Sequence, residues 1–463
     1  MFVRRLAAVL AGRFVGWLSR LVRIGGGTAV SGLVSITIDP SFVVVNLRGL
    51  ASSVAITGTN GKTTTTAVLS HLLETDGRAV LSNPTGSNLE RGLAAAMLPR
   101  LTWDGRTRGF KDLHGVFEVD EAAFAALMPD ASPTIAVFLN LFRDQLDRYG
   151  EVDHTATAWA SAVTQLDRRS TIVANADDPT IVAVARRHRG RVIFFGLDVD
   201  GLQGKPDAWA DAKRCPVCGG RLNWSRVVYA HLGCYTCSRC EFCRPDPDVR
   251  VTTFQSRGLQ GSDFTIVTPE LERRITTRLP GIYNSYNVAA AVAAGLAQGI
   301  NLEGIAHAVE MVDPTFGRAE TIDTSQTEIL LLLVKNPAGA NQILELLRPT
   351  VSSLDMLMLL NDGVADGQDV SWIWDVDFDG LAPRRIVVGG KRGQDLALRL
   401  KYAGVAPERG SLEVESDIEA ALDVGLAGTP RRLVILATYT AMLEVRKVCA
   451  HRGWVQPYWQ DVA

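Results

Sequence analysis

Short apolar, β-branched runs alternate along the chain with longer stretches of helical periodicity. Val54–Thr57 is one such run; it leads into the turn Gly58-Thr59-Asn60-Gly61, and a helical stretch follows over residues 62–75. This pattern predicts a strand, a glycine-rich loop and a helix. Further strands are predicted at Ala79–Leu81, Gly115–Val119, Ile135–Leu139, Thr171–Ala174 and Val192–Phe195. Such alternation indicates an α/β fold with a largely parallel sheet covered by helices.

The length of 463 residues suggests about three domains at roughly 150 residues each. Residues 1–50 are predicted to form an N-terminal helix and lead-in. Residues 51–312 are predicted to form a central domain, which the helical stretch Ser285–Gln298 closes. Residues 313–463 are predicted to form a second, Rossmann-like α/β domain. Its predicted strands are Ile329–Val334, Met356–Leu360, Arg385–Val388 and Arg432–Leu436.

The charge balance excludes a bulk polyanion binder, because the formal net charge is −2. The segment Met1–Ile24 is different, since arginines recur throughout its apolar residues. That arrangement argues against a secretory signal and predicts an amphipathic helix ended by Gly25-Gly26-Gly27. The helix either packs on its own domain or lies on a membrane surface. No apolar run is long enough to predict a membrane span, so we expect a cytoplasmic protein, with the second alternative placing it at the inner face of the membrane.

The cysteines predict a metal site. Six of the seven lie within Cys215–Cys243, and such a cluster in a long chain favours metal binding in a reducing compartment over a disulfide framework. Two Cys-x-x-Cys hooks with 18 residues between them have the spacing of a zinc ribbon, here inserted at residues 210–246. Cys234 and Cys243 are alternative ligands. The predicted ligands of a structural Zn²⁺ are Cys215, Cys218, Cys237 and Cys240.

The turn before the first long helix has the chemistry of a phosphate-binding loop. Backbone amides of a glycine-rich turn, at a helix N-terminus whose dipole favours anions, bind phosphate. Lys62 is then expected to reach the β- and γ-phosphates, and the Thr63 hydroxyl to bind Mg²⁺. Ile56 occupies the position of the first Walker glycine, so the loop has the shorter Gly-x-x-Gly-Lys-Thr form. The predicted ATP-binding residues here are Gly58, Thr59, Asn60, Gly61, Lys62, Thr63 and Thr64.

This loop resembles the ATP loop of the Mur ligases and their folylpolyglutamate synthetase relatives. Four further segments match that family in order: Phe117–Glu121, Asn140–Asp147, Asn175–Asp178 and Gly281–Asn287. The resemblance implies that Glu118 binds Mg²⁺ and that Asn287 meets adenine. The alternative for Glu118 is a solvated carboxylate at the end of a strand.

Two further roles come from the same resemblance. Gln145 stands where the family usually has a metal-binding histidine, and its amide oxygen suits Mg²⁺. The implied Mg²⁺ ligands are Thr63, Glu118 and Gln145. Arg318, in the segment Phe316–Glu320, is implied to reach the ATP phosphates and stabilise a developing acyl-phosphate.

The C-terminal third differs from ligases that add amino acids. Leu333–Gly339 replaces their usual acidic loop, and Asn361–Gly367 with Asp369–Asp375 forms a dense further motif. With the zinc ribbon and the early Gly-Gly-Gly-Thr-Ala, these segments resemble the MurT family, the synthetase subunits of lipid II isoglutaminyl synthase. The resemblance implies pairing with a GatD-like glutaminase that supplies ammonia. It also implies ATP-dependent amidation of the α-carboxyl of D-glutamate in the lipid II stem peptide, through an acyl-phosphate.

Three acidic residues of this motif are candidates for the partner interface. A glutaminase needs an acid to orient its histidine, and Asp366, Asp369 or Asp375 is available to supply it. Asp375 is favoured because it follows the apolar run Trp372-Ile373-Trp374. The alternative is a loop hydrogen-bond acceptor or a catalytic-loop acid of the Mur type. The predicted catalytic residues are Asp375, Asp369, Glu118 and Arg318.

Two competing functions share parts of this pattern. One is a Mur or folylpolyglutamate-type ligase that adds an amino acid. The other is a P-loop ATPase that binds nucleic acid through the zinc ribbon. Basic and acidic residues around the hooks are too evenly balanced for a surface that follows phosphates, so we expect no nucleic-acid partner.

Overall fold

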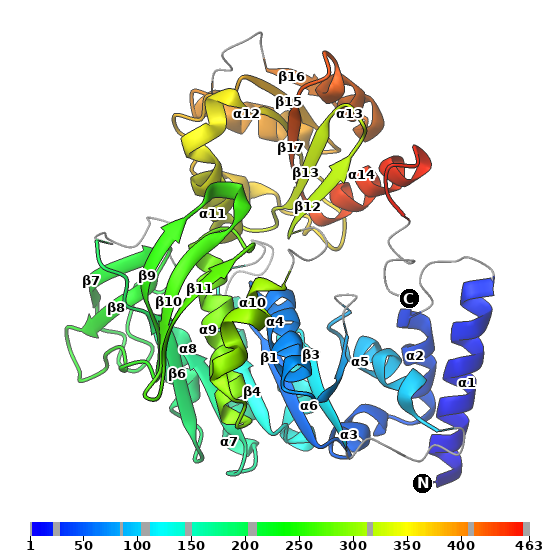
Figure 1. Cartoon of the computed structure of the whole chain (residues 1–463), viewed down its shortest axis with the longest axis vertical. Coiled ribbons are helices and arrows are strands. Elements are labelled where there is room, and N and C mark those ends of the chain that lie inside the picture. The colour runs from blue at the N-terminus through cyan, green and yellow to red at the C-terminus, as the bar shows by residue number, and fades with distance from the viewer. Residues whose placement is uncertain are drawn as a thin grey trace. The chain divides into compact units, whose positions relative to one another are not determined.

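The computed structural model divides the chain into two compact units, and both are α/β, which confirms the predicted fold class (Figure 1). The first unit comprises Met1–Phe142 and Glu151–Asp313, and the second comprises Arg143–Gly150 and Pro314–Ala463. The structure describes residues 2–21, 28–83, 87–102, 112–143, 151–201, 211–312, 318–405 and 412–456.

The described part of the first unit contains a nine-stranded sheet of order β11-β10-β9-β6-β5-β4-β1-β3-β2. Its strands are β1 Ser52–Thr57, β2 Ala79–Ser82, β3 Leu113–Glu118, β4 Ile135–Phe138, β5 Thr171–Asn175, β6 Val192–Leu197, β9 Val249–Ser256, β10 Ser262–Val267 and β11 Glu272–Thr277. The neighbours from β2 through β3, β1, β4, β5 and β6 to β9 pair in parallel, and β10 pairs antiparallel with both β9 and β11. The parallel strands β1 to β6 lie where they were predicted. The antiparallel edge was not predicted, because its strands alternate buried and exposed positions and carry many polar residues.

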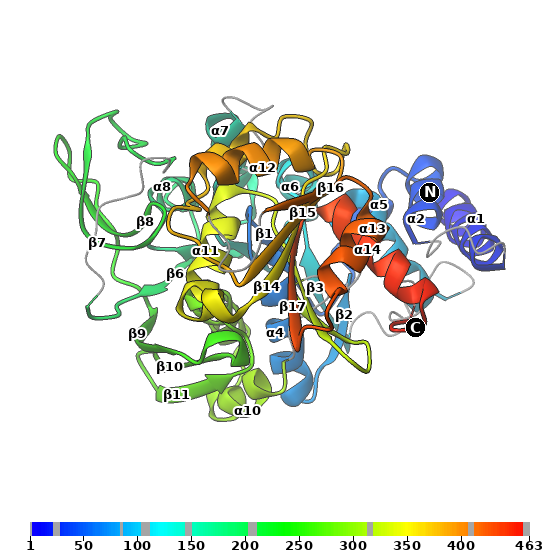
Figure 2. The same ribbon diagram turned by 90° about the horizontal axis from the view of Figure 1, so that it is seen from above.

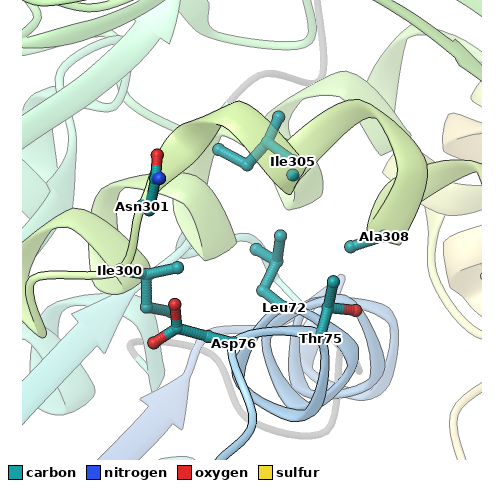
Figure 3. Close-up of a pocket in the computed structure, with 8 residues that line it drawn as sticks. Leu72, Thr75, Asp76, Ile300, Asn301, Ile305 and Ala308 are labelled. Atoms are coloured by element: carbon teal, nitrogen blue, oxygen red, sulfur yellow. The ribbon is translucent and has the colours of Figure 1, made fainter.

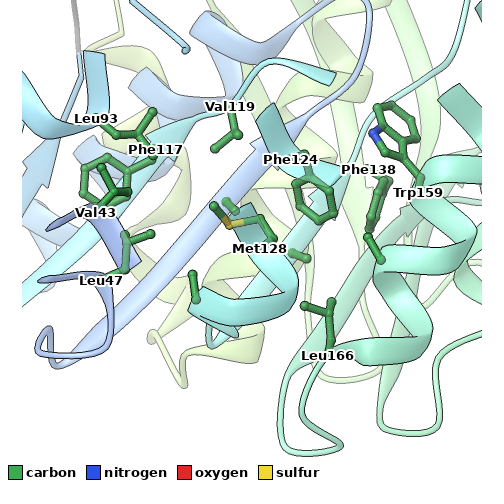
Figure 4. Packing of buried hydrophobic residues seen from close by; sticks show 14 of the residues in the cluster. Val43, Leu47, Leu93, Phe117, Val119, Phe124, Met128, Phe138, Trp159 and Leu166 are labelled. Carbon is green, nitrogen blue, oxygen red and sulfur yellow. The ribbon is translucent and has the colours of Figure 1, made fainter. Parts of the chain in front are cut away.

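Helices cover both faces of this sheet. Helices α4 (Lys62–Thr75) and α9 (Ile282–Ala297) contact one face. Helices α6 (Glu121–Ala131), α7 (Glu151–Gln165) and α8 (Pro179–Ala185) contribute to the core on the other face (Figure 4). There the ring of Phe138 lies edge-on to Phe124 and Trp159, with centroid distances of 4.9 and 5.3 Å. Buried aromatic pairs of this geometry fix the helices firmly on the strands.

The strand order brings the predicted site residues to one edge of the sheet. Strand β1 lies between β3 and β4, so the chain leaves β1 in one direction along the sheet and later returns to its other side. In open α/β sheets, ligands bind at the carboxyl ends of the strands beside such a reversal. The phosphate loop follows β1, Glu118 ends β3, Asn140 follows β4, and Asn175 ends β5.

Three helices precede the sheet and belong to the first unit: α1 (Phe2–Leu21), α2 (Thr28–Ile38) and α3 (Phe42–Leu47). Helix α1 lies along α2, and α2 packs on α5 (Glu90–Met97). Small residues make the contact between α1 and α2 close, since a Cβ at Gly12 would lie 2.2 Å from Ser35 Oγ.

Within the described ranges, no helix combines the length and apolar character that crossing a bilayer requires.

The described residues of the second unit form a six-stranded sheet of order β12-β13-β17-β14-β15-β16, which is parallel except for β12. Its strands are β12 Arg318–Asp323, β13 Glu328–Leu333, β14 Asp355–Leu359, β15 Arg385–Gly389, β16 Glu413–Glu415 and β17 Arg432–Ala437. Helices cover both faces of this sheet, and the strand side chains point alternately to one face and the other. The side chains of one face pack against α13 (Ile418–Leu426) and α14 (Tyr439–His451), while α11 (Pro337–Leu347) and α12 (Gly393–Tyr402) lie on the other face (Figure 2).

Candidate functional site

The predicted phosphate loop connects β1 to α4 and has the backbone geometry that a tight turn requires. Gly58 and Gly61 have φ values of 142° and 93°, and Gly61 is the N-cap of α4. These values favour glycine, because other residues meet steric resistance there. The first amides of α4 therefore face the loop, where a helix N-terminus attracts anions.

The side chains that follow the turn are buried and paired. Lys62 folds back to donate to the carbonyl of Gly58, and its Nζ lies 2.9 Å from Glu121 Oε1. The Thr63 hydroxyl donates to Glu118 Oε2 at 2.7 Å. Glu118 is only 4% exposed, so it is not a solvated carboxylate at the end of a strand. The structure thus brings Lys62, Thr63 and Glu118 together, as the sequence predicted.

Several polar residues that the sequence analysis missed hold Glu118 in place. The Asn83 amide accepts from the Glu118 backbone N–H and donates to its carbonyl, both at 2.9 Å. Asn88 Nδ2 lies 3.4 Å from Glu118 Oε1. Asp120 instead caps α6 by accepting from Ala122 N at 3.0 Å, and burial, with Glu121 beside it, raises its pKa. These residues come together only through the pairing of β2 with β3, which the spacing along the chain does not reveal.

The loop after β4 clamps the phosphate loop from the other side. Asn140 Oδ1 accepts from Asn60 N at 2.9 Å, and Asn140 Nδ2 donates to Asn60 O at 3.0 Å. The Thr59 hydroxyl accepts from Phe142 N at 3.0 Å and donates to Phe142 O at 3.1 Å. Together with a fifth hydrogen bond, from Thr59 N to Asn140 O at 3.0 Å, these contacts fix the conformation of the turn through Thr59 and Asn60.

Asn287, the residue implied to meet adenine, lies against the phosphate loop. A Cβ at Gly61 would stand 2.1 Å from Asn287 Oδ1, so only glycine permits this approach. The Asn287 amide is oriented by donating to Asn284 Oδ1 at 2.9 Å, and Asn284 in turn donates to Pro280 O at 2.7 Å. Helix α9 therefore presents a buried, oriented amide directly beside the turn.

The turn after β5 is a buried polar network. Asp177 is fully buried, and its carboxylate accepts from Tyr286 Oη and Arg244 Nε, each at 2.6 Å. Burial, with Asp177 nearby, raises the pKa of Tyr286, so the phenol remains a neutral donor. Asp178 caps α8 and also accepts from Leu141 N at 2.9 Å. This network ties α9 to the loop that clamps the phosphate turn.

The four predicted zinc ligands converge on one point. Their sulfur atoms all lie within 4.8 Å of one another, with 3.7 Å between Cys215 and Cys240 and 3.5 Å between Cys218 and Cys237. A tetrahedral zinc with bonds of about 2.3 Å requires sulfur separations of about 3.8 Å. The backbone N–H of Gly220 also points at Cys218 Sγ, at 3.4 Å, a contact that stabilises a thiolate. The four sulfurs therefore fit Zn²⁺; Cys234 and Cys243 lie outside this group.

The hairpin of the ribbon, β7 (Leu222–Tyr229) and β8 (Leu232–Cys237), reaches the polar network. His231, next to its tip, is fully buried, with Nε2 3.5 Å from Asp178 Oδ2 and its ring 5.0 Å from that of Phe142. Gly233 N donates to Asp177 O at 3.0 Å. The insertion is therefore built into the support of the phosphate loop.

A shallow pocket lies at the opposite end of α4 and is not part of this site (Figure 3). Leu72 and Thr75 line it from α4, and Ile300 and Ile305 line it from the segment after α9. Because a 14-residue helix is about 21 Å long, these residues are remote from Lys62.

The acidic candidates of the second unit differ in their surroundings. Asp366 is 3% exposed and accepts from Thr440 N at 2.8 Å, so it holds the start of α14. Asp369 accepts from Ser371 N at 2.8 Å, and hydrogen bonding to Ser371 lowers its pKa. Asp375 is half-buried, and its Oδ2 lies 3.4 Å from Arg143 Nη2.

Asp375 ends a short 3-10 helix, Ser371–Asp375, whose backbone is anchored by one cation. The buried guanidinium of Arg399 donates to Ile373 O at 3.3 Å and Val376 O at 2.7 Å. Asp375 is thus held on a rigid segment. Gln145 and the side chain of Arg318 lie outside the described residues, so their predicted roles stay predictions.

The fold and the phosphate loop place the chain among the Mur ligases, which use ATP and Mg²⁺. A family model described as the Mur ligase middle domain matches residues 56–213. A pseudomurein peptide ligase type C from Methanothermus fervidus shares the fold, with a TM-score of 0.63 and 20% identity, covering 87% of this chain and 79% of that one. MurF from Acinetobacter baumannii gives a TM-score of 0.64 and 17% identity, covering 90% and 80%.

More similar relatives narrow the class. A model described as MurT ligase C-terminal matches residues 333–442. The Streptococcus pneumoniae protein named lipid II isoglutaminyl synthase (glutamine-hydrolyzing) subunit MurT is 33% identical, covering 98% of this chain and 99% of that one. Its Staphylococcus aureus counterpart is 28% identical, covering 82% and 84%. The chain belongs to the MurT family.

Gly61→Ala is expected to lower the affinity for ATP with Mg²⁺ at least about tenfold, measured by isothermal titration calorimetry. The added methyl group would displace Asn287 and distort the turn. Gly77→Ala is the matched control, since Gly77 also has a positive φ, 79°, but no atom lies within 4 Å of its added Cβ. Both variants lose about 1 kcal/mol of stability from backbone strain. Equal ATP affinities in the two variants would contradict the prediction that ATP binds at the turn beside Asn287.

The purified chain is expected to contain about one zinc ion, measured by atomic emission. The double variant Cys218→Ser/Cys237→Ser should lose the metal and several kcal/mol of unfolding free energy. It should also bind ATP more weakly, because the hairpin supports the loop at Phe142. The control Cys234→Ser/Cys243→Ser should keep both zinc and ATP affinity; loss of zinc from this control would show that the ligand set is wrong.

Proposed function

We propose that this chain is the synthetase subunit of a glutamine-hydrolysing lipid II isoglutaminyl synthase. It uses ATP to amidate the α-carboxyl of D-glutamate in the lipid II stem peptide. The observation that carries this proposal is the hydrogen bond from Thr63 to the buried Glu118 beneath the candidate phosphate loop, in a chain of which 98% aligns with a relative named as that subunit. Peptidoglycan biosynthesis is the process it would serve, at the inner face of the cell membrane.

The chemistry requires activation of a carboxylate, which is a poor electrophile. Transfer of the γ-phosphoryl group of ATP to a carboxylate oxygen gives an acyl-phosphate; attack by ammonia on its carbonyl carbon then forms the amide and releases phosphate. Lys62 and the amides at the start of α4 are proposed to stabilise negative charge on the phosphates. Arg318 is proposed to add a second cation.

The oxygen donors beside the loop suit Mg²⁺. Mg²⁺ prefers hard oxygen ligands and commonly uses a carboxylate together with phosphate oxygens. The Glu118 carboxylate and the Thr63 hydroxyl provide such oxygens, and Gln145 is the third proposed ligand. When bound, the metal would neutralise part of the phosphate charge. Asn83 and Asn88 serve this role indirectly by fixing Glu118.

Ammonia is proposed to come from a GatD-like partner. At neutral pH free ammonia is mostly ammonium, which is not a nucleophile, so delivery at the site is favoured. Cys449, the one cysteine outside the cluster, does not suit a glutaminase nucleophile in this chain. It is buried in the core of the second unit, and burial raises its pKa to about 11.

The substrate assignment is tested by ADP release in the presence of lipid II, Mg²⁺ and a series of nitrogen donors. With a GatD-like glutaminase present, we expect turnover with glutamine; with the chain alone, turnover is expected at high ammonium concentration. A panel of amino acids should give none. Amino-acid-dependent turnover would instead identify a ligase that extends a peptide, and lack of ATP affinity would refute both.

Asp375 is the proposed acid for the partner's glutaminase site. Asp366 is fully used in holding α14 and Asp369 in its own loop turn, whereas Asp375 is half-exposed on a segment that Arg399 anchors. An acid that orients a histidine must be rigidly held, and this placement provides that rigidity.

Asp375→Asn is expected to lower the glutamine-driven rate at least about a hundredfold, because an amide orients a catalytic histidine wrongly. The ammonium-driven rate and the ATP affinity should stay within about twofold, since neither uses the glutaminase. Asp377→Asn is the control: Asp377 is more exposed and pairs with Arg348. An Asp375→Asn complex with undiminished glutamine hydrolysis would refute the role.

A further inference from the structure

Helix α1 has two apolar faces, and only one is buried by the protein. The inner face consists largely of small residues and contacts α2, with Ala8 and Val9 fully buried and Gly12 and Gly16 against Ser35 and Ser31. Larger apolar residues lie on the opposite side. Those exposed to solvent are Val3 (75%), Leu10 (42%), Phe14 (60%), Trp17 (55%) and Leu18 (42%).

These exposed residues form a continuous stripe. Positions 3, 10, 14 and 17, with Ala7 between the first two, repeat at intervals of three and four residues, which places them on one side of an α-helix. The rings of Phe14 and Trp17 lie 6.0 Å apart at the C-terminal end of the stripe. Helix α2, which lies alongside α1 (Figure 1), contacts the inner face of α1 and is not part of this stripe. An apolar stripe of this length marks an interaction surface.

The charge around the stripe selects its partner. Residues 1–38 contain five arginines and no aspartate or glutamate; the next residue, Asp39, is buried, with a carboxylate oxygen 3.8 Å from Arg5 Nε. Successive α-helical residues are turned by about 100°, so Arg4 lies on one flank of the stripe and Arg13 on the other. Arg4 is exposed and donates to the carbonyl of Ile38, a neutral group that leaves its positive charge in place. Arginines flanking an apolar stripe with Phe and Trp are typical of helices that lie in the interface of an anionic bilayer.

We propose that α1 forms a membrane-docking surface, with its apolar stripe entering the interface and the flanking arginines meeting anionic lipid headgroups. A second copy of the chain fits this surface less well. Two such segments would oppose arginines without any carboxylate between them, which costs energy instead of pairing charges. The surface is defined without reference to the ligase reaction, but it would hold the chain where a lipid substrate lies.

The test is co-sedimentation of the full chain, alone and with its glutaminase, with phosphatidylcholine vesicles that contain or lack phosphatidylglycerol. Binding should require phosphatidylglycerol and weaken as salt is raised, because exposed charges are screened. The double variant Phe14→Ser/Trp17→Ser should lower vesicle partitioning at least about tenfold, since it removes the two aromatic side chains of the stripe. The matched control is Leu398→Ser/Tyr402→Ser, which alters exposed apolar residues of α12.

Circular dichroism and thermal unfolding verify that both double variants fold; the replaced side chains at positions 14 and 17 are exposed, so folding should be retained. Vesicle binding by Phe14→Ser/Trp17→Ser equal to that of the control would overturn the proposal. Concentration-dependent dimerisation that this variant abolishes, without any vesicle binding by the parent chain, would overturn it in favour of a second copy. Turnover of a water-soluble stem-peptide analogue should be unchanged in the variant, which separates this surface from the proposed ligase activity.

Discussion

The candidate site depends on one buried carboxylate. A glutamate at the end of a central strand loses most of its hydration, and that loss is tolerated only when hydrogen bonds or a cation replace it. In this chain Thr63 and Asn88 supply side-chain donors to Glu118, while Asn83 fixes its backbone. A buried carboxylate held this way also gains from a nearby positive charge. Its burial therefore agrees with the proposed role of Glu118 as a ligand of Mg²⁺ beside a triphosphate.

The predicted zinc ribbon, which lies outside the loop, also supports the candidate site. Its two hooks form a small cluster with little apolar core of its own, centred on Cys215, Leu222, Tyr235 and Phe242. A metal stabilises such a small module where hydrophobic burial does not. The hairpin of this module contacts the rest of the site through the buried His231, which packs between Asp178 and Phe142. Metal binding at the four cysteines would thus be linked to the proposed nucleotide binding through packing contacts, although the cysteines lie outside the loop.

Periodicity and glycine placement predicted the parts of the molecule that local sequence determines. The parallel strands are largely apolar because helices cover both faces of the sheet. The turn was predicted because Gly58 and Gly61 are glycines, which tolerate the positive φ values found there. The roles of Asn83, Asn88 and Glu121 were missed because Asn83 and Asn88 reach Glu118, and Glu121 reaches Lys62, only after β2, β3 and β1 have paired. The antiparallel edge β9–β11 was missed for another reason: its half-exposed strands carry too many polar residues to form an apolar run.

The N-terminal segment shows why an amphipathic pattern alone left two alternatives. Packing on the protein and contact with a membrane both require an apolar face. A helix with a single apolar face can use it for only one of the two. Helix α1 has two, with alanine and glycine turned toward α2 and phenylalanine and tryptophan turned away. Close helix contact needs small residues, whereas insertion between lipid headgroups gains from large aromatic ones. The small residues and the large aromatic residues lie on opposite sides of α1, so packing against α2 leaves the aromatic side available for the proposed membrane contact.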